Sequence, residues 1–405
     1  MTGGSALWLF TTAFPFGHGE AFLENEVPVL AQRFTQVRLF PLERSGAMRP
    51  LPANVSVSDV LHPFDMAGPT ALLRQQADLR RLLSSLWKDA PSWGGLWRER
   101  RVLFSRMRAL LRRADVLRAE LDGHAGPLVL YAYWLHDQST VLALLKRTHG
   151  DRKMVARAHG FDLYAERSAN GWIPFRTLQL ASLDRIHCIS EHGARYLREV
   201  YPAFAEKIIR SRLGTSDQGA GPWSPAPVLR IVSCSHLIPL KRVHLIAEAL
   251  RHVRVLVEWT HFGSGPEQAR LEALVAQLPS GSTVRLMGAV PNQDVIAHYR
   301  TTPVDVFLHL SSNEGLPVVL MEAASFGIPL LACDVGGVGE LVNEHTGRLL
   351  PKDVDPADVG ALLNTFLEGP MHTAAFRQGV REAWAAGFRA TTNFARFCDD
   401  LLSPR

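Results

Sequence analysis

The sequence predicts an α/β protein of two domains, each built on a parallel sheet with helices on both faces. Its 405 residues exceed the usual size of a single domain. Apolar runs of strand length alternate with helical stretches along most of the chain, which is typical of doubly wound sheets. A segment rich in Gly, Pro and Ser, residues 217–227, interrupts this alternation. We therefore expect a first domain over 1–216 and a second over 217–385.

The individual elements follow from the apolar periodicity. In the first domain, strands are predicted over residues 6–10, 37–41, 128–134, 154–158 and 185–189. Helices are expected over 21–33, 139–147 and 191–200, with two helical stretches in 66–124 that are broken at 91–95. Glu24 and Glu26 are expected on the solvated face of the first helix. In the second domain, helices separate strands predicted over 229–233, 253–260, 283–287, 304–310, 329–332 and 347–350.

The composition is that of an ordinary globular protein, with 47% hydrophobic and 20% charged residues. A net charge of +5 does not by itself indicate a nucleic-acid partner, and none is predicted. The four cysteines are widely spaced and form no Cys-x-x-Cys pair, so neither a zinc site nor a disulfide framework is expected. We expect no signal peptide and no membrane span, because no apolar run approaches 18 residues. A reducing, cytoplasmic location is therefore predicted.

The most informative segment follows a predicted buried strand and runs Ser311-Ser312-Asn313-Glu314-Gly315-Leu316-Pro317-Val318-Val319-Leu320-Met321-Glu322. Pro317 suits the first turn of a helix. Glu314 then lies in the strand-to-helix loop and Glu322 just over a turn into the helix. The backbone N–H groups of Gly315 and Leu316 point to the same space, where the helix dipole favours an anion. A single Glu would be explained better by the helix dipole alone, but the glycine, the proline and both spacings together indicate a ligand site.

Three other strand ends carry residues that suit a ligand. Lys241 follows the strand 229–233 and could neutralise a diphosphate, although a solvated lysine is as good an explanation. Gly263 and Gly265 form a Gly-x-Gly loop without the third glycine of a dinucleotide fingerprint, so NAD binding is not predicted. His159 ends the strand 154–158, where a lone histidine is more often structural than catalytic.

At Glu314-Gly315-Leu316-Pro317 and Glu322 the chain resembles the retaining glycosyltransferases of family 4, whose hallmark is Glu-Gly-x-Pro-x-x-x-x-Glu. The resemblance is strong over about 231–350 and patchy before that. It implies the GT-B fold, in which two Rossmann-like domains face each other across a cleft. It also implies that a C-terminal helix, here within 386–405, packs back on the N-terminal, acceptor-side domain. The donor would be a nucleotide sugar of the UDP or GDP type, bound by the second domain as a co-substrate without any further cofactor.

The resemblance also implies roles for individual residues. Glu314 would orient the donor sugar, Glu322 would bind the ribose hydroxyls and Lys241 would neutralise the diphosphate. His159 would contact the donor sugar near the reacting centre, so Glu314, His159 and Lys241 are the expected catalytic residues. Further donor-binding residues are expected in the glycine loops, around Glu314 and beside Lys241, namely Gly17, Gly19, Ser190, His236, Arg242, Gly263, Gly265, Asn313, Gly315, Leu316 and Pro317.

The sequence departs from the family pattern beside Lys241. His236 stands where the family has a phosphate-binding arginine and Arg242 where it has a glycine, so either of them could supply the second phosphate contact. Ser190 has an equally good role as a helix cap. Asp353 and Asp355 have the Asp-x-Asp spacing that another class of glycosyltransferases uses for a metal ion. Since Pro356 starts a helix, Asp355 is expected to cap it, and no metal site is predicted.

Residues 66–124 contain twelve Lys or Arg against six Asp or Glu, interleaved with Leu, Trp and Phe. Basic amphipathic helices with aromatic residues often lie on anionic membranes. An ordinary helix pair with a basic solvent face explains the pattern equally well. We expect peripheral attachment to the inner face of the plasma membrane through 66–124, and a glycan or lipid-linked acceptor.

The sequence therefore predicts a retaining, metal-independent glycosyltransferase in cell-surface polysaccharide biosynthesis. One alternative is a catalytically inactive homologue that binds a glycan or a partner protein. The intact Glu314, Glu322 and Lys241 argue against it, and His236 argues weakly for it. A nucleotide-sugar epimerase or a phosphorylase of similar fold is the other alternative, and donor turnover without an acceptor would indicate an epimerase.

Overall fold

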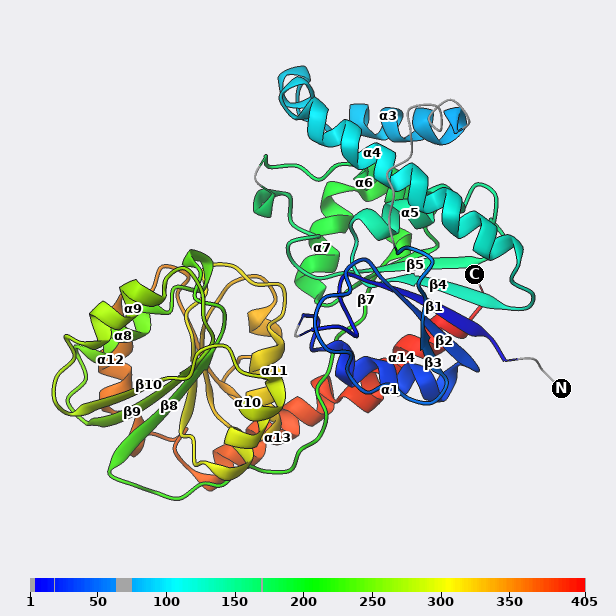
Figure 1. The fold of residues 1–405 in the computed structure, drawn as a ribbon. Coiled ribbons are helices and arrows are strands. Elements are labelled where there is room, and N and C mark those ends of the chain that lie inside the picture. Colours follow the sequence, from blue (N-terminus) through cyan, green and yellow to red (C-terminus); the bar gives the residue numbers. More distant parts are fainter. Residues whose placement is uncertain (1–3, 18, 63–74, 169, 405) are drawn as a thin grey trace. The chain divides into compact units, whose positions relative to one another are not determined.

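The computed structural model describes residues 4–17, 19–62, 75–168 and 170–404. The chain forms two compact units, and Figure 1 shows a sheet in each. The first unit comprises Met1–Arg212 with Phe394–Arg405, and the second comprises Leu213–Asn393. Residues 66–74 of the predicted basic helical segment lie outside the described residues.

The first domain contains a seven-stranded sheet in the order β3-β2-β1-β4-β5-β6-β7, and its paired strands are parallel. Most of its side chains are buried, because helices cover both faces, and this explains the continuous apolar runs. The five predicted strands are confirmed, whereas β3 and β7 have only three residues each and were not predicted. The strands are β1 (Ala6–Thr11), β2 (Gln36–Pro41), β3 (Val55–Val57), β4 (Leu128–Ala132), β5 (Lys153–Ala158), β6 (Arg185–Cys188) and β7 (Ile208–Arg210).

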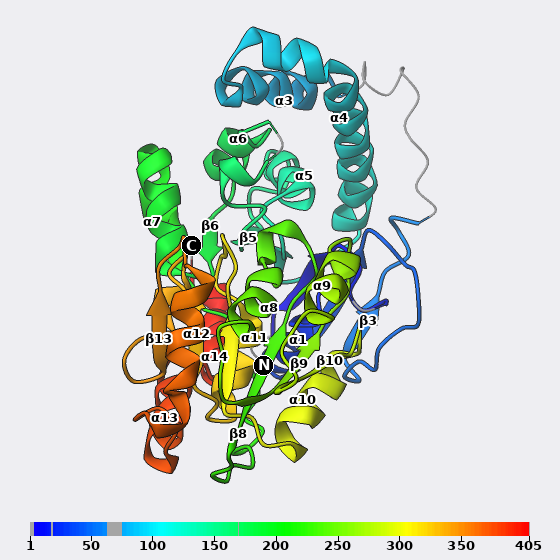
Figure 2. The ribbon, with the colours of Figure 1, turned by 90° about the vertical axis from the view of Figure 1, so that its left-hand side faces the viewer.

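The helices of the first domain form two layers on one face of this sheet. Figures 1 and 2 show α3 and α4 lying outside α5 and α6, so that α5 is buried nearly all round, including its polar residues Gln138, Ser139 and Thr140. On the other face lie α1 and the final helix α14. These helices are α1 (Leu23–Arg33), α3 (Gln76–Asp89), α4 (Trp93–Asp122), α5 (Asp137–Leu145), α6 (Arg176–Ser182), α7 (Glu191–Val200) and α14 (Ala390–Leu402).

The break between α3 and α4 differs from the prediction. It covers only residues 90–92, whereas the sequence placed it at 91–95. Ser92 caps α4, since its hydroxyl accepts a hydrogen bond from the N–H of Gly95 at 3.2 Å. Gly94 and Gly95 are therefore tolerated in the first turn, where the backbone N–H groups have no partner within the helix.

The predicted solvent exposure of Glu26 is wrong. Glu26 is fully buried, and its Oε1 lies 3.1 Å from Nη2 of Arg157, which is fully buried as well. Arg157 also donates from Nε to the Tyr131 hydroxyl at 2.7 Å, and its guanidinium lies 4.1 Å from the ring centre of Phe397 on α14. Burial alone would lower the pKa of Arg157, but Glu26 and Tyr131 outweigh it and raise that pKa. A charge so deeply buried requires a charged partner, which explains the pairing.

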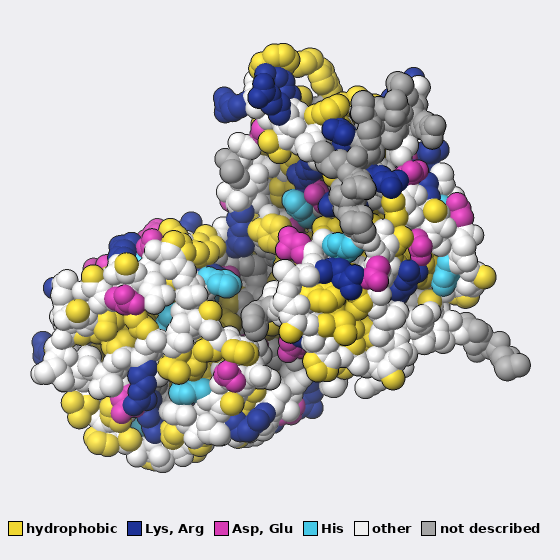
Figure 3. All heavy atoms as spheres, in the orientation of Figure 1, with side chains coloured by type: hydrophobic (Ala, Val, Ile, Leu, Met, Phe, Trp, Pro, Cys, Tyr) yellow, Lys and Arg dark blue, Asp and Glu magenta, His cyan; other side chains and the backbone are white. Residues whose placement is uncertain are grey.

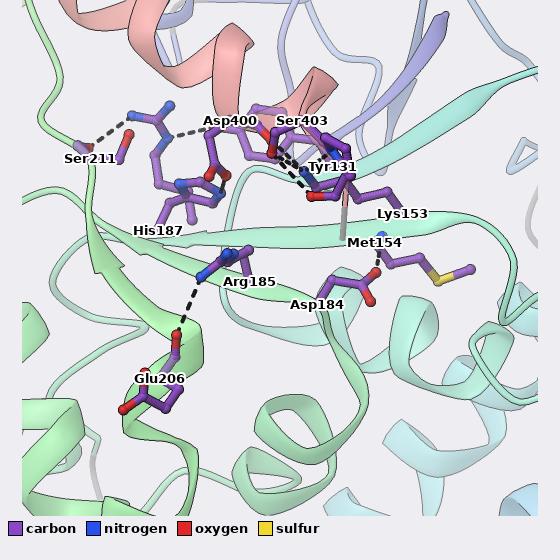
Figure 4. Close-up of polar contacts among 12 residues, drawn as sticks. Tyr131, Lys153, Met154, Asp184, Arg185, His187, Glu206, Ser211, Asp400 and Ser403 are labelled. Carbon is purple, nitrogen blue, oxygen red and sulfur yellow. Dashed lines mark hydrogen bonds and ion pairs between the residues drawn. The ribbon is translucent and has the colours of Figure 1, made fainter.

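Polar contacts also fix the end of α14 to the first sheet (Figure 4). Lys153 of β5 donates from Nζ to the backbone carbonyl groups of Asp400 and Ser403, the latter at 3.0 Å. His187 of β6 lies 3.3 Å from the Asp400 carboxylate, and this histidine lowers the pKa of Asp400. These contacts attach the C-terminal segment to the first domain, as the division into units also indicates.

The second domain contains a six-stranded parallel sheet in the order β10-β9-β8-β11-β12-β13, which confirms its predicted strands. Figure 1 shows α8, α9 and α12 on one face and α10, α11 and α13 on the other. The strands are β8 (Val228–Cys234), β9 (Leu256–Phe262), β10 (Ser282–Leu286), β11 (Val306–His309), β12 (Leu330–Cys333) and β13 (Gly347–Leu350). The helices are α8 (His244–Leu250), α9 (Gln268–Val275), α10 (Asn292–Thr301), α11 (Val318–Ser325), α12 (Pro356–Asn364) and α13 (Ala374–Phe388).

The strand order reverses in each sheet. The first strand of each domain, β1 or β8, lies between the strand that follows it in the chain and a later strand, β4 or β11. The loops after such a pair run to opposite faces of the sheet and leave a crevice at the carboxyl ends of the strands. The topology therefore directs attention to the loops that follow β1, β4, β8 and β11.

Candidate functional site

The loops after β8 and β11 bring together two of the residues that the sequence singled out. Nζ of Lys241 lies 2.5 Å from Oε1 of Glu314. A third residue joins them, because Nε2 of His309, the last residue of β11, lies 2.8 Å from the same oxygen. Glu314 and His309 are buried, whereas the side chain of Lys241 stays 19% exposed. The cluster thus has one cation that a ligand can reach.

The charge of Glu314 is set by these two neighbours. Burial alone would raise its pKa, but the hydrogen bond from His309 and the charges of His309 and Lys241 outweigh burial. The pKa of Glu314 is therefore held far below its ordinary value, and the side chain is a carboxylate at any physiological pH. A carboxylate can accept hydrogen bonds from the hydroxyl groups of a ligand but cannot act as a proton donor.

Backbone contacts hold the Glu314 loop in place. A side chain at Gly336, whose φ is +56°, would place its Cβ 1.9 Å from the carbonyl oxygen of Glu314, so only glycine fits there. The N–H of Gly337 donates to the carbonyl oxygen of Gly315 at 2.7 Å. On the other side, Ser312 donates from its N–H to the carbonyl oxygen of Leu240 at 2.9 Å, which ties this loop to that of Lys241.

Glu322 lies on α11, which begins directly after Pro317 as the sequence predicted. It is buried, and its Oε1 accepts a hydrogen bond from Nδ2 of Asn292 at 2.9 Å. Asn292 is the first residue of α10, so it fixes the carboxylate from a neighbouring helix. Leu316, between the two glutamates, is buried, while Asn313, just before Glu314, is partly exposed.

The two residues that depart from the family pattern have different surroundings. His236 is exposed in the loop after β8. Arg242 has a left-handed backbone, with a φ of +47°, and its guanidinium donates to the carbonyl oxygens of Leu310 and Lys352, both at 2.7 Å. Arg242 therefore joins three loops at the carboxyl edge of the sheet. Its predicted contact with a phosphate stays a prediction, as does that of His236.

The glycine loop after β9 packs closely on the loop after β8. Gly263 has a φ of +138°, and a Cβ there would lie 1.9 Å from the carbonyl oxygen of Ser235. The N–H of Leu237 donates to the carbonyl oxygen of Ser264 at 2.9 Å, and Gly265 likewise lies against Leu237. The two glycines are thus needed for loop packing, whatever ligand they contact.

A buried histidine lies beneath these loops. His261 of β9 pairs through Nδ1 with the Ser233 hydroxyl at 2.8 Å, and that oxygen accepts a hydrogen bond from Nε1 of Trp259 at 2.9 Å. Burial lowers the pKa of His261 to about 4, so its imidazole is neutral at pH 7.

In the first domain, His159 directly follows β5 and is surrounded by rings. Its ring centre lies 4.3 Å from that of Trp134 and 4.6 Å from that of Tyr133. Burial lowers its pKa, although Asp162 opposes the shift. Asp162 accepts hydrogen bonds from the backbone N–H groups of His159 and Leu135 at 2.8 and 2.9 Å, and so joins the loops after β4 and β5. The arrangement presents a neutral imidazole at the carboxyl edge of the sheet.

The loop after β1 is shaped by Glu20, which the sequence did not single out as a site residue. Its carboxylate accepts hydrogen bonds from Nε1 of Trp134 at 2.5 Å and from the backbone N–H groups of Thr12, Ala13 and Phe14. The carbonyl oxygens of Gly17 and Gly19 accept hydrogen bonds from the guanidinium of Arg49. Glu20 thereby connects the β1 loop to Trp134 beside His159.

Ser190 and Asp355 both cap helices. The sequence left this role open for Ser190 and favoured it for Asp355. Ser190 is buried, and its hydroxyl accepts a hydrogen bond from the N–H of Gly193 at the start of α7. Asp355 accepts from the N–H of Ala357 at 2.9 Å and caps α12. Within the part of the chain that the structure describes, no group of three acidic, histidine or cysteine side chains is placed to hold a metal ion. None of the described helices is both long and apolar enough to cross a membrane.

The sequence did not identify His309 and Asn292. His309 could have been found as a polar side chain at the carboxyl end of the apolar run that precedes Glu314. No local signal marks Asn292, because its partner Glu322 lies thirty residues further along the chain.

Solved structures define the fold class. The structure of HepE from Anabaena with UDP-glucose matches with a TM-score of 0.68 at 17% identity, covering 98% of this chain and 99% of that chain. Sucrose-phosphate synthase from Thermosynechococcus elongatus matches with a TM-score of 0.71 at 15% identity, covering 98% of both chains. These matches, together with the two parallel sheets, confirm the predicted GT-B fold.

Sequence comparison then gives the family. Residues 225–383 match the family model Glycosyl transferases group 1. WcaL of Escherichia coli (strain K12), a glycosyltransferase assigned to colanic acid biosynthesis, is 30% identical over 254 residues, which cover 60% of this chain and 59% of WcaL. The matched residues contain Glu314 and Glu322, so the family model agrees with the resemblance at that segment of the second domain. The alignment spans little more than half the length of WcaL.

Proposed function

We propose that this protein is a retaining glycosyltransferase that moves a sugar from a nucleotide-sugar donor to a glycan or lipid-linked acceptor in cell-surface polysaccharide assembly. The observation that carries the proposal is the cluster of Lys241, His309 and Glu314 at the reversal point of the second sheet. It lies within the residues that match the family. A reachable cation, an ionised carboxylate and the start of α11 suit a ligand that combines phosphates with sugar hydroxyls.

In the proposed reaction, the bond between the anomeric carbon and the diphosphate oxygen breaks, and the acceptor oxygen forms a new bond to that carbon. The nucleoside diphosphate leaves with the bonding electrons and takes up the proton that the acceptor hydroxyl loses. Lys241 and the N–H groups at the start of α11 stabilise the negative charge that develops on the diphosphate. Glu314 accepts hydrogen bonds from the sugar hydroxyls, Glu322 from the ribose hydroxyls, and the neutral His159 offers an N–H to the donor sugar.

The names of related proteins support two classes of donor. HepE has been solved with UDP-glucose, and a relative in Mycolicibacterium smegmatis, 26% identical over 331 residues, is named as a GDP-mannose-dependent phosphatidylinositol monomannoside mannosyltransferase. That alignment covers 74% of this chain and 80% of the relative. We therefore propose a UDP- or GDP-sugar as donor. The name of WcaL supports a polysaccharide pathway, and the basic segment 66–124 supports attachment to an anionic membrane.

Thermal unfolding with nucleotides tests the donor site. UDP, GDP, ADP and their common sugar conjugates are compared on the wild type, Lys241→Ala and Glu322→Ala. A ligand at one hundred times its dissociation constant should stabilise the folded protein by about 2.7 kcal/mol. We expect one nucleotide to raise the melting temperature of the wild type and to have little effect on either variant. The exposed residues Lys352 and Glu344 provide matched controls, since Lys352→Ala and Glu344→Ala should respond as the wild type does.

The outcomes separate the alternatives. If no nucleotide stabilises the wild type, the protein is better explained as a non-catalytic glycan- or partner-binding subunit. If a nucleotide sugar binds and is converted to another nucleotide sugar without any acceptor, an epimerase is indicated. Stabilisation by a nucleotide that survives in both Lys241→Ala and Glu322→Ala would place the donor elsewhere and overturn the assignment of the site.

A further inference from the structure

The first turns of α4 extend beyond the core of the first domain. From Leu103 onward, buried side chains recur at helical spacing, whereas none of residues 93–102 is buried. Trp93 and Trp97 are 71% and 70% exposed, which is unusual for the largest apolar side chain. An exposed apolar group of this kind marks a surface that another molecule covers.

Trp87 of α3 extends this surface. Its ring meets that of Trp93 edge to face, with the ring centres 4.2 Å apart, and it is 57% exposed. We call Trp87, Trp93 and Trp97 the aromatic tip. Arginines surround it, because Arg98, Arg100 and Arg101 are all exposed and the guanidinium of Arg100 lies 4.3 Å from the ring centre of Trp97. Figure 3 shows apolar and basic side chains side by side at the outer end of these helices.

This composition matches a membrane interface better than a protein partner. Tryptophan is enriched at the level of the lipid head groups, where its ring is apolar and its N–H can bind water. Arginine beside it is attracted to lipid phosphates. The aromatic tip therefore combines the two features that dock a helix on an anionic membrane surface.

An open pocket of about 530 Å³ begins where the aromatic tip ends. The side chains that line it are Arg101, Val102, Ser105, Arg106, Ala109 and Arg113 of α4, with Asp137 at the start of α5. Three guanidinium groups face one carboxylate, so the lining carries a net charge of two positive units. Its volume is within the usual range for a small-molecule site.

The single carboxylate of the pocket is already neutralised. Nε of Arg106 lies 2.5 Å from Oδ1 of Asp137, and Nη2 of Arg106 donates to Nε2 of His136 at 3.1 Å. Because a guanidinium can only donate, Nε2 of His136 carries no proton and its imidazole is neutral. Burial lowers the pKa of His136 in the same sense. Arg101, which is exposed, offers a cation that a ligand can reach.

A row of rings leads from this pocket to His159. The ring centre of His136 lies 5.9 Å from that of Phe161, which is 52% exposed. Phe161 in turn lies 4.9 Å from Trp134, and Trp134 lies 4.3 Å from His159. These residues belong to the loops after β4 and β5, at the carboxyl edge of the first sheet. The pocket is thus connected to the proposed catalytic histidine within one domain.

We propose that the pocket of Arg101, Arg106 and Arg113 binds the phosphate or diphosphate group of a lipid-linked acceptor. The lipid chain leaves past Val102 toward the aromatic tip, which docks on the membrane, and the end to be glycosylated extends along Phe161 toward His159. This inference rests on the proposed transferase function and specifies its acceptor. The shared chemistry is a phosphate group, and we commit to its lipid-linked form.

Vesicle sedimentation tests the proposal with the full chain. The vesicles contain phosphatidylcholine alone or with phosphatidic acid, whose head group is a bare phosphate. The variants are Arg101→Gln/Arg113→Gln for the pocket and Trp93→Ser/Trp97→Ser for the tip. The control is Arg80→Gln/Arg195→Gln, which removes two exposed charges elsewhere in the domain. Arg101→Gln alone is included, because Arg101 is exposed and its replacement leaves the fold intact.

We expect the wild type to bind the phosphatidic acid vesicles and the pocket variant to bind them about 30-fold more weakly, at roughly fivefold for each charge near the surface. The tip variant should lose binding to both kinds of vesicle, and the control should bind as the wild type does. Arg101→Gln alone should bind about fivefold more weakly. Equal binding by the control and pocket variants would contradict the role of the pocket arginines in binding. Equal binding of the wild type to both vesicle types would contradict recognition of a phosphate group.

Two further measurements are needed. The first distinguishes a soluble phosphate from a lipid-linked one, and the second distinguishes failure of this inference from failure of the proposed transferase function. Inorganic pyrophosphate should compete with the vesicles only weakly. Complete displacement by it, with no effect of the tip variant, would show a site for soluble phosphate instead of a lipid. The nucleotide that stabilises the wild type should stabilise every variant equally. A wild type that fails to bind vesicles but still binds the nucleotide contradicts this inference alone. A wild type that binds no nucleotide contradicts the proposed function.

Discussion

Two buried carboxylates, one in each domain, differ in whether a ligand can reach the cationic side chain that pairs with them. Glu26 is enclosed with Arg157 beneath Phe397 of α14, and neither charged side chain has any exposed surface. Glu314 is buried as well, but its partner Lys241 keeps 19% of its side chain exposed, at the reversal point of the second sheet. Both pairings satisfy a buried charge. The comparison teaches that burial and ion pairing indicate a ligand site only where one partner stays accessible.

The largest expected effect on stability is in the enclosed pair. Arg157→Met should lower the free energy of unfolding by about 3–5 kcal/mol, because Glu26 would be left as a buried charge without a cation. Denaturant unfolding monitored by tryptophan fluorescence measures the change. The folded variant should still be stabilised by the nucleotide that stabilises the wild type, since the pair takes no part in donor binding.

A matched double variant identifies the cause. Glu26→Leu/Arg157→Met removes both charges and should recover most of the lost stability, because replacing a whole buried ion pair with apolar groups is often neutral. A double variant as unstable as Arg157→Met alone would show that packing against Phe397, and not the charge of Glu26, explains the loss.

The accessible pair should behave in the opposite way. Lys241→Met should change the free energy of unfolding by at most about 1 kcal/mol, because Lys241 is partly exposed and Nε2 of His309 still contacts the Glu314 carboxylate. Turnover of the donor should fall about 100-fold or more, as expected when a charge that stabilises the leaving group is removed. Steady-state kinetics with the nucleotide sugar that binds, beside denaturant unfolding, measure both effects. A variant that is strongly destabilised but fully active would abolish the contrast between the two pairs.

The fold of the second domain could be predicted from sequence because its signals are local. The glutamate of the strand-to-helix loop, Pro317 and Glu322 lie within a dozen residues, and strand, turn and helix follow directly from that string. The partner of Glu322 could not be predicted, because Asn292 starts a different helix. A spacing rule describes one segment and contains no information on which neighbouring element completes the site.

Glu26 shows the same limit in the first domain. Helical periodicity places it on one face of α1, but the sequence does not show that α14, more than 360 residues later, covers that face. Arg157 was likewise part of a predicted strand with no predicted partner. The two-layer arrangement of α3 and α4 over α5 also depends on contacts distant in sequence. The exposed aromatic tip could therefore be identified only once the structure showed where the core ends.

His309 allows the charge of Glu314 to be tested by pH. The pKa of Glu314 is lowered in the folded state, so its ionisation stabilises the protein fully above the unfolded value near 4.5, and this contribution is lost as pH falls through the lower folded pKa. His309→Leu should raise the folded pKa and reduce stability by about 1–3 kcal/mol at pH 7. The difference from the wild type should shrink only as the pH falls through the folded pKa of Glu314 in the variant, because the unfolded pKa is common to both proteins. Denaturant unfolding over a pH series from neutral down to the acid limit of the folded state measures it.

His309→Gln provides the control for this prediction, since its side-chain amide can still donate a hydrogen bond to Glu314. It should restore part of the stability lost in His309→Leu. A stability difference that stays constant down to the acid limit of the folded state would contradict the coupling, because it would show that the loss comes from packing at the end of β11.

The smallest effect is expected at Glu322, a third buried carboxylate, which accepts a hydrogen bond from the uncharged amide of Asn292. Asn292→Ala should weaken binding of the stabilising nucleotide by about tenfold at most, since one such bond contributes about 1 kcal/mol. Asn292→Asp keeps the size of the side chain but places a second negative charge beside Glu322, so it should weaken binding further. Isothermal titration calorimetry compares the three proteins. If Asn292→Ala binds the nucleotide as tightly as the wild type does, α11 alone sets the orientation of Glu322. Glu322 would then differ from Glu26 in the accessibility of its own carboxylate, and not in the accessibility of its partner Asn292.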